Sequence, residues 1–367
     1  MKILLIGEYS NVHWTLAEGL RSLGHEVCVI SNGDFWKDYK RDISLTRHTY
    51  GKFEGMKYLI KLYALLPRLR GYDVVQVINP MFLELKAERI APIYRYLKKH
   101  NRKIFLGAYG MDAYWVEACT KEPYTFRYSD FNIGNKRVHN EFVDEQVADW
   151  QNTPKAELNR EIASSCNGII AGMYEYHTAY KEKHAQKLTY IPFPIYSERN
   201  KAMKMHDGKE KIKFFIGIQK SRSIYKGTDI MLRALERIAT EHPDECEILK
   251  AESVPFAQYT GMVNNCHVLL DQLYGYSPGM NALLAMSKGK IVVGGAEEEC
   301  YSILGEEELR PMVNVIPSEE DIYDKLKQLL KNKELIPAMQ QQSIEFIEKH
   351  HHPRKVAERY LEFWNKM

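Results

Sequence analysis

The chain alternates short aliphatic runs with helical patterns of apolar residues. MKILLIG, which ends in Gly7, and EVCVIS (26–31) are the first two runs. Apolar residues recur at helical spacing between them, at Trp14, Leu16, Leu20 and Leu23. Uninterrupted aliphatic runs are typical of parallel strands that are buried on both faces. The first thirty or so residues therefore predict a strand–helix–strand unit.

The same alternation continues along the chain and is interrupted once. Later runs are DVVQVIN, KIFLGAYG and GIIAGM in the first half, and IKFFIGI, CHVLLD, KIVVGG and NVIP in the second. The interruption, residues 190–214, is charged, contains two prolines and lacks apolar periodicity, so we interpret it as a linker. We therefore predict an α/β fold of two doubly wound, Rossmann-like domains facing a cleft. The expected domains are 1–195 and 196–350, with a C-terminal helix at 351–367 that crosses back to the first domain.

Composition is that of an ordinary folded protein. Hydrophobic residues make up 45% and charged residues 27% of the 367 positions, and no apolar run approaches the ~18 to 20 residues that span a bilayer. Residues 1–12 lack the features of a secretory signal, which predicts a cytoplasmic protein. The six cysteines are scattered and there is no Asp-x-Asp pair, so we expect no metal site.

Charge is uneven although the net charge is only +3. Nine Lys/Arg and three Asp/Glu lie between Lys37 and Arg70. Within this stretch GMKYLIKLYALLPRLR (55–70) predicts a basic amphipathic helix broken at Pro67. It is either a solvated helix covering a core or a peripheral contact with the inner face of an anionic membrane. Nucleic-acid binding is not expected, because the overall charge is near balance and the basic residues lie in predicted helices, without interleaved aromatic residues presented on a sheet.

Two loops of the second half suit an anionic ligand. GIQKSRSIYKGTDI (217–230) follows a predicted strand and contains Arg222 and Lys226 before a Gly-Thr-Asp turn. SPGMN (277–281) stands where a helix begins, so its backbone N–H groups face outward. Cations beside a helix N-terminus suit a diphosphate. The alternatives from residue types alone are a solvated loop and a capped core helix.

Taken together these loops resemble a known family. R-x-x-x-K-G-T-D, followed later by G-M-N-A-L-L-A-M-S-x-G-K-x-V-V, is similar to the donor half of retaining, nucleotide-sugar-dependent glycosyltransferases of family 4, which have the GT-B fold. The segments LLIGEYSNVHWTLAEGLRSLGHEV, YDVVQVINP, LGAYGMD and CNGIIAGMYEYHTAYKE occur in the family's order. The resemblance implies a metal-independent hexosyltransferase in cell-surface polysaccharide synthesis. Its donor would be a nucleoside diphosphate sugar and its acceptor a glycan or a lipid-linked saccharide, with no other cofactor.

The resemblance also implies roles for particular residues. Arg222 and Lys226 would hold the donor diphosphate and neutralise it as it leaves. The rest of the donor site would come from Gly217, Ser277, Pro278, Gly279, Met280 and Asn281. Gly7 and His13 would close the cleft from the other domain. Asp112 would bind a sugar hydroxyl, unless it is the N-cap of the helix that follows it.

The chain departs from the family at two positions. The family usually has glutamates eight positions apart, the second of which binds the nucleotide ribose, and here these positions are Tyr276 and Leu284. A leucine side chain cannot accept a hydrogen bond. Glu297, Glu298 or Glu299 could supply a ribose or sugar contact instead, the alternative being a solvated acidic turn.

Three other functions are considered. A dehydrogenase is disfavoured because Gly-x-Gly-x-x-Gly is absent after the first strand. A nucleotide-sugar epimerase would need acid/base carboxylates, for which Asp112 and Glu297 to Glu299 are the candidates. A non-catalytic sugar-nucleotide-binding protein is suggested by the missing glutamates. The last two stay open on sequence alone.

Overall fold

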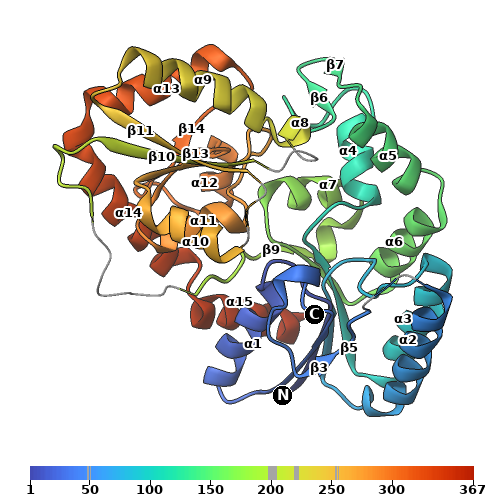
Figure 1. Cartoon of the computed structure of the whole chain (residues 1–367). Coiled ribbons are helices and arrows are strands. Elements are labelled where there is room, and N and C mark those ends of the chain that lie inside the picture. Colours follow the sequence, from blue (N-terminus) through green and yellow to red (C-terminus); the bar gives the residue numbers. More distant parts are fainter. Residues whose placement is uncertain (48, 50, 197–204, 219–222, 253, 255) are drawn as a thin grey trace. The chain divides into compact units, whose positions relative to one another are not determined.

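The computed structural model describes residues 1–367 except 48, 50, 197–204, 219–222, 253 and 255. The chain forms two compact units (Figure 1). The N-terminal unit comprises Met1–Ala118, Asp144–Pro194 and Pro353–Met367. The C-terminal unit comprises Cys119–Val143 and Ile195–His352.

The N-terminal unit is built on a parallel sheet in the order β3-β2-β1-β4-β5-β8-β9. Its strands are β1 (Lys2–Ile6), β2 (Glu26–Ser31), β3 (Ile43–Ser44), β4 (Val74–Val77), β5 (Lys103–Ala108), β8 (Gly168–Ala171) and β9 (Leu188–Tyr190). Its helices are α1 (Val12–Ser22), α2 (Lys52–Leu65), α3 (Ala87–His100), α4 (Ala113–Thr120), α5 (Glu141–Trp150), α6 (Pro154–Ser165), α7 (Tyr174–His184) and α15 (Pro353–Lys366). Helices α4 and α5 reach a few residues past the unit boundaries at 118 and 144. The central strand β1 is almost entirely buried, as expected for an aliphatic strand covered on both faces.

The C-terminal unit has a parallel sheet in the order β11-β10-β12-β13-β14. Its strands are β10 (Ile212–Ile218), β11 (Cys246–Glu252), β12 (Val268–Leu270), β13 (Ile291–Gly294) and β14 (Val313–Asn314), and β6 (Asn132–Ile133) pairs with β7 (Lys136–Arg137) in a separate hairpin. Its helices are α8 (Ser223–Lys226), α9 (Thr228–Glu241), α10 (Phe256–Asn265), α11 (Met280–Ser287), α12 (Glu298–Leu304), α13 (Glu319–Lys331) and α14 (Ile336–His350). Helices α9 and α13 contribute Leu235, Ile238 and Leu326 to the core beneath the sheet.

The last helix belongs to the N-terminal unit, where α15 packs against α1 (Figure 1). The two helices approach closely at Gly19, where a Cβ atom would lie 2.3 Å from the carbonyl oxygen of Pro353. A larger residue at position 19 would therefore push the helices apart. Tyr360 and Trp364 of α15 are fully buried.

Two parallel, doubly wound sheets confirm the predicted fold class. The basic helix begins at Lys52 and ends at Leu65, and Pro67 lies in the following 3-10 turn, Leu66–Arg68. The stretch Cys119–Val143 groups with the C-terminal unit, whereas the predicted division at residue 195 assigns it to the first domain. Among the described residues, no helix has both the length and the apolar character needed to cross a membrane.

Candidate donor site

The two predicted ligand loops follow neighbouring strands of the C-terminal sheet. The chain passes from β10 to the edge strand β11 on one side, and returns to β12 on the other side of β10. The strand order therefore reverses between β10 and β12. Open α/β sheets bind ligands beyond the carboxyl ends of their strands at such a switch point. The connection after β10 contains Lys226, the last residue of the short helix α8, and the connection after β12 contains Ser277–Asn281, whose last two residues begin α11.

A backbone hydrogen bond joins these two loops. The N–H of Leu273 donates to the carbonyl oxygen of Lys226 at 2.9 Å. The next residue, Gly227, has a left-handed backbone with φ of +68°, and a Cβ atom there would lie 2.6 Å from the Cβ atom of Leu273. Glycine thus meets two requirements, the positive φ and the close approach. Lys226 is consequently fixed beside the second loop. Arg222, its predicted partner, and residues 219–221 lie outside the described residues.

The second loop leads into the N-terminus of α11. Gly279 is the N-cap residue and has no side chain of its own with which to cap the helix. Asn281 is turned away from a capping role, because its Nδ2 donates to Asp271 Oδ1 at 3.0 Å and its Oδ1 accepts from the Tyr259 hydroxyl at 2.8 Å. First-turn N–H groups at the positive end of a helix favour an anion. Ser277 and Pro278 are buried, and Gly279 and Met280 are half-buried.

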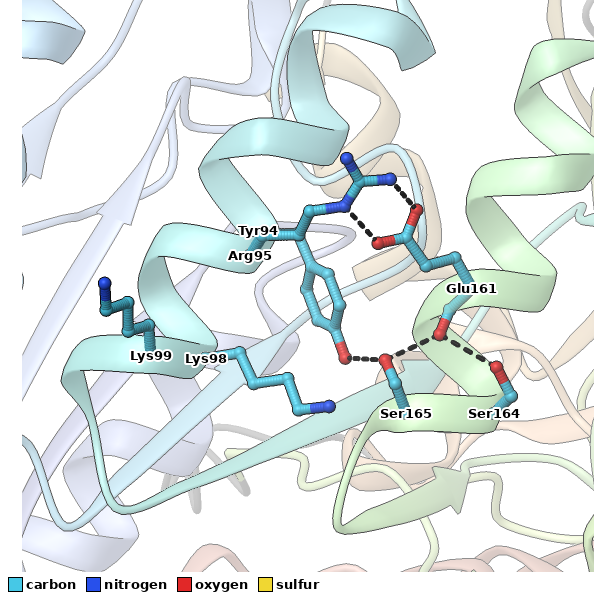
Figure 2. Close-up of a pocket in the computed structure, with 7 residues that line it drawn as sticks. All are labelled: Tyr94, Arg95, Lys98, Lys99, Glu161, Ser164 and Ser165. Carbon is cyan, nitrogen blue, oxygen red and sulfur yellow. Dashed lines mark hydrogen bonds and ion pairs between the residues drawn. The ribbon is translucent and has the colours of Figure 1, made fainter.

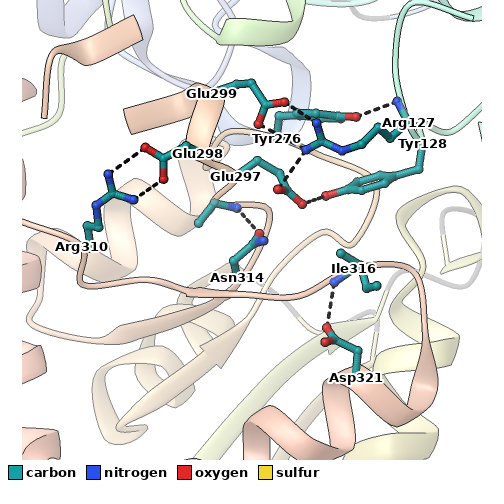
Figure 3. Close-up of polar contacts among 11 residues, drawn as sticks. Arg127, Tyr128, Tyr276, Glu297, Glu298, Glu299, Arg310, Asn314, Ile316 and Asp321 are labelled. Atoms are coloured by element: carbon teal, nitrogen blue, oxygen red, sulfur yellow. Dashed lines mark hydrogen bonds and ion pairs between the residues drawn. The ribbon is translucent and has the colours of Figure 1, made fainter. Parts of the chain in front are cut away.

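Tyr276, at the position of the family's first glutamate, is buried by the segment Cys119–Val143, which we call the strap (Figure 3). Its ring stacks on Tyr128 with the ring centroids 5.0 Å apart. Its hydroxyl accepts a hydrogen bond from the backbone N–H of Arg127 at 2.8 Å. The tyrosine therefore anchors the strap. Leu284, at the second position, is half-buried on α11.

The acidic turn after β13 is engaged rather than solvated (Figure 3). Glu297 accepts from Arg127 Nη2 at 3.0 Å and from the Tyr128 hydroxyl. Glu299 also accepts from Arg127, and this hydrogen bond lowers the pKa of the carboxyl group and raises that of the guanidinium. Glu298 pairs instead with Arg310, with Nη2 2.8 Å from Oε1. Two of the three glutamates thus hold the strap.

The strap also reaches the first donor loop. Phe142 stacks face to face on Tyr225, with the ring centroids 4.0 Å apart and the planes 11° from parallel. Tyr225 directly precedes Lys226. Arg127, Tyr128 and Phe142 were not identified from the sequence, because their partners lie far away along the chain and no local periodicity marks them.

The remaining predicted residues lie in the N-terminal unit. Gly7 has a φ of +87°, and its carbonyl oxygen lies 2.8 Å from Nδ1 of the fully buried His13. Burial lowers the pKa of His13 to about 3, so the imidazole is neutral. The structure thus brings Gly7 and His13 together inside this unit.

Asp112 has the geometry of a helix N-cap, which was the alternative to a contact with a sugar hydroxyl. It is fully buried, its Oδ1 accepts from the Trp115 N–H at 2.9 Å, and its Oδ2 accepts from the Tyr180 hydroxyl at 2.6 Å. These are the contacts of an N-cap for α4. Burial raises the pKa of Asp112 to about 6.

A pocket of about 410 Å³ lies on α3 and α6 (Figure 2). Arg95 and Glu161 form a two-pronged ion pair at 2.6 and 2.7 Å, and the Tyr94 hydroxyl lies 2.8 Å from Ser165 Oγ. These contacts join the two helices, so we assign the pocket a structural role.

One group of metal-binding residue types occurs in the described part of the chain. It consists of His206, Asp207 and Glu210. Both ring nitrogens of His206 already have partners, the Gly208 N–H at 2.9 Å and the Glu210 carbonyl oxygen at 3.1 Å. The neighbouring His267 precedes β12, at the amino end of the sheet. This group therefore lies at the amino ends of the strands, whereas the donor loops follow the carboxyl ends.

Comparisons with known proteins give a match in structure. The sequence matches no protein-family model and no curated protein. Over the whole chain the structure is similar to Anabaena HepE in complex with UDP and glucose, with 10% identity, 100% of both chains covered and a TM-score of 0.60. It is also similar to WaaG, a glycosyltransferase involved in lipopolysaccharide biosynthesis, with 12% identity, 98% and 99% covered and a TM-score of 0.52. MnaA of S. aureus in complex with UDP matches with 11% identity, 98% and 95% covered and a TM-score of 0.55.

The chain has the GT-B fold. Identities of 10 to 12% establish the fold and no individual residue role. Within the GT-B fold, the loops after β10 and β12 remain the candidate donor site, on the geometry given above.

Proposed function

We propose that the protein is a glycosyltransferase that uses a nucleoside diphosphate sugar and transfers the sugar with retention to a glycan or lipid-linked acceptor. The hydrogen bond between Leu273 and Lys226 carries this proposal. It fixes a lysine beside the loop that leads into the α11 N-terminus, at the switch point of the sheet. Structures of the same fold with UDP or UDP and glucose bound support a nucleotide-sugar donor.

In the proposed reaction the bond between the anomeric carbon and the diphosphate oxygen breaks, and its electron pair leaves on that oxygen. The acceptor hydroxyl attacks from the same face and passes its proton to the departing diphosphate. Lys226, the first-turn N–H groups of α11 and the predicted Arg222 would stabilise the negative charge that develops. This arrangement needs no metal ion.

The sugar and ribose contacts differ from the family pattern in this proposal. Tyr276 cannot replace a carboxylate, because its hydroxyl already accepts from Arg127. Glu297 stays a proposed contact for the donor sugar, with its carboxylate oriented by Arg127 and Tyr128. Glu298 stays a proposed donor contact too, although its partner here is Arg310.

The test is sugar transfer by Lys226→Ala and Arg222→Ala. We expect each to lower kcat/KM at least about tenfold, a loss of about 1.4 kcal/mol of transition-state stabilisation. Lys331→Ala is the control, because Lys331 is exposed at the end of α13. Full transfer activity in both variants would disprove the donor-site assignment.

Incubation of labelled nucleotide sugars without acceptor separates the remaining alternatives. An epimerase converts the donor under these conditions, whereas a retaining transferase returns it unchanged or slowly hydrolysed. Calorimetry with UDP and GDP then tests the binding-protein alternative. Nucleotide binding without transfer or hydrolysis to any acceptor would favour it.

The exposed face of α2 supports a peripheral membrane contact. Four large apolar side chains are exposed at a spacing that places them on one face: Phe53 (73%), Met56 (59%), Ile60 (64%) and Tyr63 (54%). Tyr58 and Leu62 pack into the protein on the other side. Lys52, Lys57 and Lys61 lie on the same helix and are exposed. An apolar face flanked by lysines is typical of helices that lie in an anionic membrane interface. On this proposal the protein works at the cytoplasmic face of the membrane.

Flotation with anionic liposomes tests this contact. Each exposed side chain contributes apolar area to the interface, so we expect Phe53→Ser/Ile60→Ser to lower the floated fraction at least about fivefold. Leu335→Ser removes an exposed apolar residue of the C-terminal unit and should leave flotation unchanged. Wild-type protein that stays wholly in the soluble fraction would contradict the contact.

A further inference from the structure

A second cavity of the N-terminal unit lies at that unit's own switch point. The cavity has a volume of about 1050 Å³. The strand order reverses between β1 and β4, and the walls include Gly7 after β1, Ser31 at the end of β2 and Ile78 after β4. This is the position at which an open α/β sheet binds a ligand.

The walls of the cavity are predominantly cationic. Five cations line it, namely Arg47, Lys52, Lys86, Arg89 and Lys155. The acids are Glu8 and Glu84. Burial raises the pKa of Glu8 to about 8, so this carboxyl group is mostly neutral at pH 7. The cavity therefore favours an anionic ligand.

Individual wall residues are open to a ligand. Lys52, Lys86 and Arg89 are exposed, and the described residues include no ion-pair partner for them. Glu84 bonds through Oε1 to Asn32, whereas its buried Oε2 has no hydrogen-bond partner in the described part of the chain. Such an oxygen suits a hydroxyl group of a ligand, because a buried acceptor without a partner is costly.

One side of the cavity is formed by α2. Gly55, Met56 and Leu59 line it. Met56 also belongs to the exposed apolar face of Phe53, Met56, Ile60 and Tyr63. The cationic cavity and the apolar face therefore meet at Met56. A ligand with a charged group in the cavity and an apolar chain directed toward a membrane matches both surfaces.

We infer that this cavity binds the phosphate or diphosphate group of a lipid-linked acceptor, whose chain leaves past Met56 along α2. The inference rests on the proposed function and names its acceptor class. A neutral glycan would leave Lys52, Lys86 and Arg89 without a counter-charge among the described residues, whereas a phosphate group accepts hydrogen bonds from Arg and Lys. An anion without an apolar chain would make no contact with the exposed apolar face of α2.

Calorimetry with the full chain tests the inference without vesicles or donor. The probes are farnesyl diphosphate, inorganic pyrophosphate and farnesol. We expect farnesyl diphosphate to bind at least about tenfold more tightly than either other probe, because it alone contacts both surfaces. Equal affinity for pyrophosphate would indicate a free-anion site, equal affinity for farnesol would indicate an apolar pocket, and no binding would indicate neither. Each of these three results overturns the inference.

Variants assign the binding to this cavity. Lys52→Ala/Arg89→Ala should weaken farnesyl diphosphate binding about tenfold, since both cations line the cavity. Lys98→Ala/Lys99→Ala is the matched control, because these lysines of α3 line the separate pocket of Figure 2. Met56→Gln should weaken farnesyl diphosphate but not pyrophosphate. An equal loss of farnesyl diphosphate affinity in Lys98→Ala/Lys99→Ala would overturn the assignment of this binding to the cavity.

The result of these binding measurements can be distinguished from the result of the transfer assays that test the proposed function. Lys226 lies in the C-terminal unit, so Lys226→Ala should leave farnesyl diphosphate binding unchanged. If Lys226→Ala and Arg222→Ala retain full transfer activity, the donor assignment fails and the cavity measurement still stands. If farnesyl diphosphate does not bind while the donor variants lose activity, only the acceptor class is wrong.

Discussion

Glu8 and His13 are buried side by side in the N-terminal unit with pKa values displaced in opposite directions. Glu8 accepts from the N–H groups of His13 and Trp14 at 3.2 and 2.9 Å. Burial raises the pKa of Glu8 to about 8 and lowers that of His13 to about 3. Both groups are therefore neutral at pH 7, as expected where water is excluded.

The two groups have opposite effects on the pH dependence of stability. Between pH 4.5 and 8, folded Glu8 keeps a proton that unfolded Glu8 has lost, so the free energy of unfolding falls by about 1.4 kcal/mol per pH unit as pH rises. Below pH 6.5, unfolded His13 gains a proton that folded His13 does not bind, so stability falls as pH falls. The two effects offset each other between pH 4.5 and 6.5.

Glu8→Gln should remove the Glu8 effect on stability and leave the opposite effect of His13. We expect the free energy of unfolding of the variant, relative to wild type, to rise by about 3 kcal/mol between pH 5 and 7.5, because glutamine does not titrate. Urea unfolding at these two pH values measures the difference. Glu26→Gln, at an exposed carboxyl of β2, is the control. A relative stability that does not change with pH would show that Glu8 is ionised in the folded protein.

At the scale of the elements, the sequence did not reveal the strap. Arg127 and Tyr128 hold it to Glu297 and Glu299, and Phe142 holds it to Tyr225 beside Lys226. The strap thus contacts the turn after β13 and the first donor loop, both in the C-terminal unit. We expect it to order the donor site.

Hydrogen exchange can test this ordering. Arg127→Ala removes the hydrogen bonds to two carboxylates, so we expect faster amide exchange in residues 119–143 and in the acidic turn, with unchanged exchange in β12. Because the Arg127 side chain is 57% exposed, its coupling energy with Glu299 in a double-mutant cycle should stay below about 1 kcal/mol. Arg237→Ala, which breaks another exposed ion pair, is the control. Unchanged exchange in the strap would contradict its anchoring by Arg127.

Elements with a strong local pattern were predictable and the others were not. The buried strands β2 and β10 match the predicted ranges, since a continuous aliphatic run marks them. The strand β11 (CEILKAE) was missed because it lies at the sheet edge, pairs on one side only and has charged residues at three of its seven positions. The role of Lys226 stays a prediction from its motif. Tyr276 was singled out from the sequence, but its partner Tyr128 depends on a tertiary contact that no local pattern encodes.

At the scale of the whole molecule, each unit is assembled from separate stretches of chain. The N-terminal unit takes its last helix from residues 353–367, and the C-terminal unit takes the strap from residues 119–143. Trp364 of α15 is fully buried against Phe105 and Tyr360, with ring centroids 6.0 and 5.4 Å away. The core of the first unit therefore includes the last residues of the chain.

Calorimetry should show separate unfolding transitions for the cores of the two units. We expect Trp364→Ala to destabilise the N-terminal unit by about 3 to 5 kcal/mol, because it removes a large buried side chain. For a unit of this size the corresponding drop in Tm is roughly 6 °C or more. Leu326→Ala, at a fully buried position of α13, should lower only the transition of the C-terminal unit. If both variants shift a single common transition equally, the two units unfold together, and the contacts that divide the chain do not define independent cores.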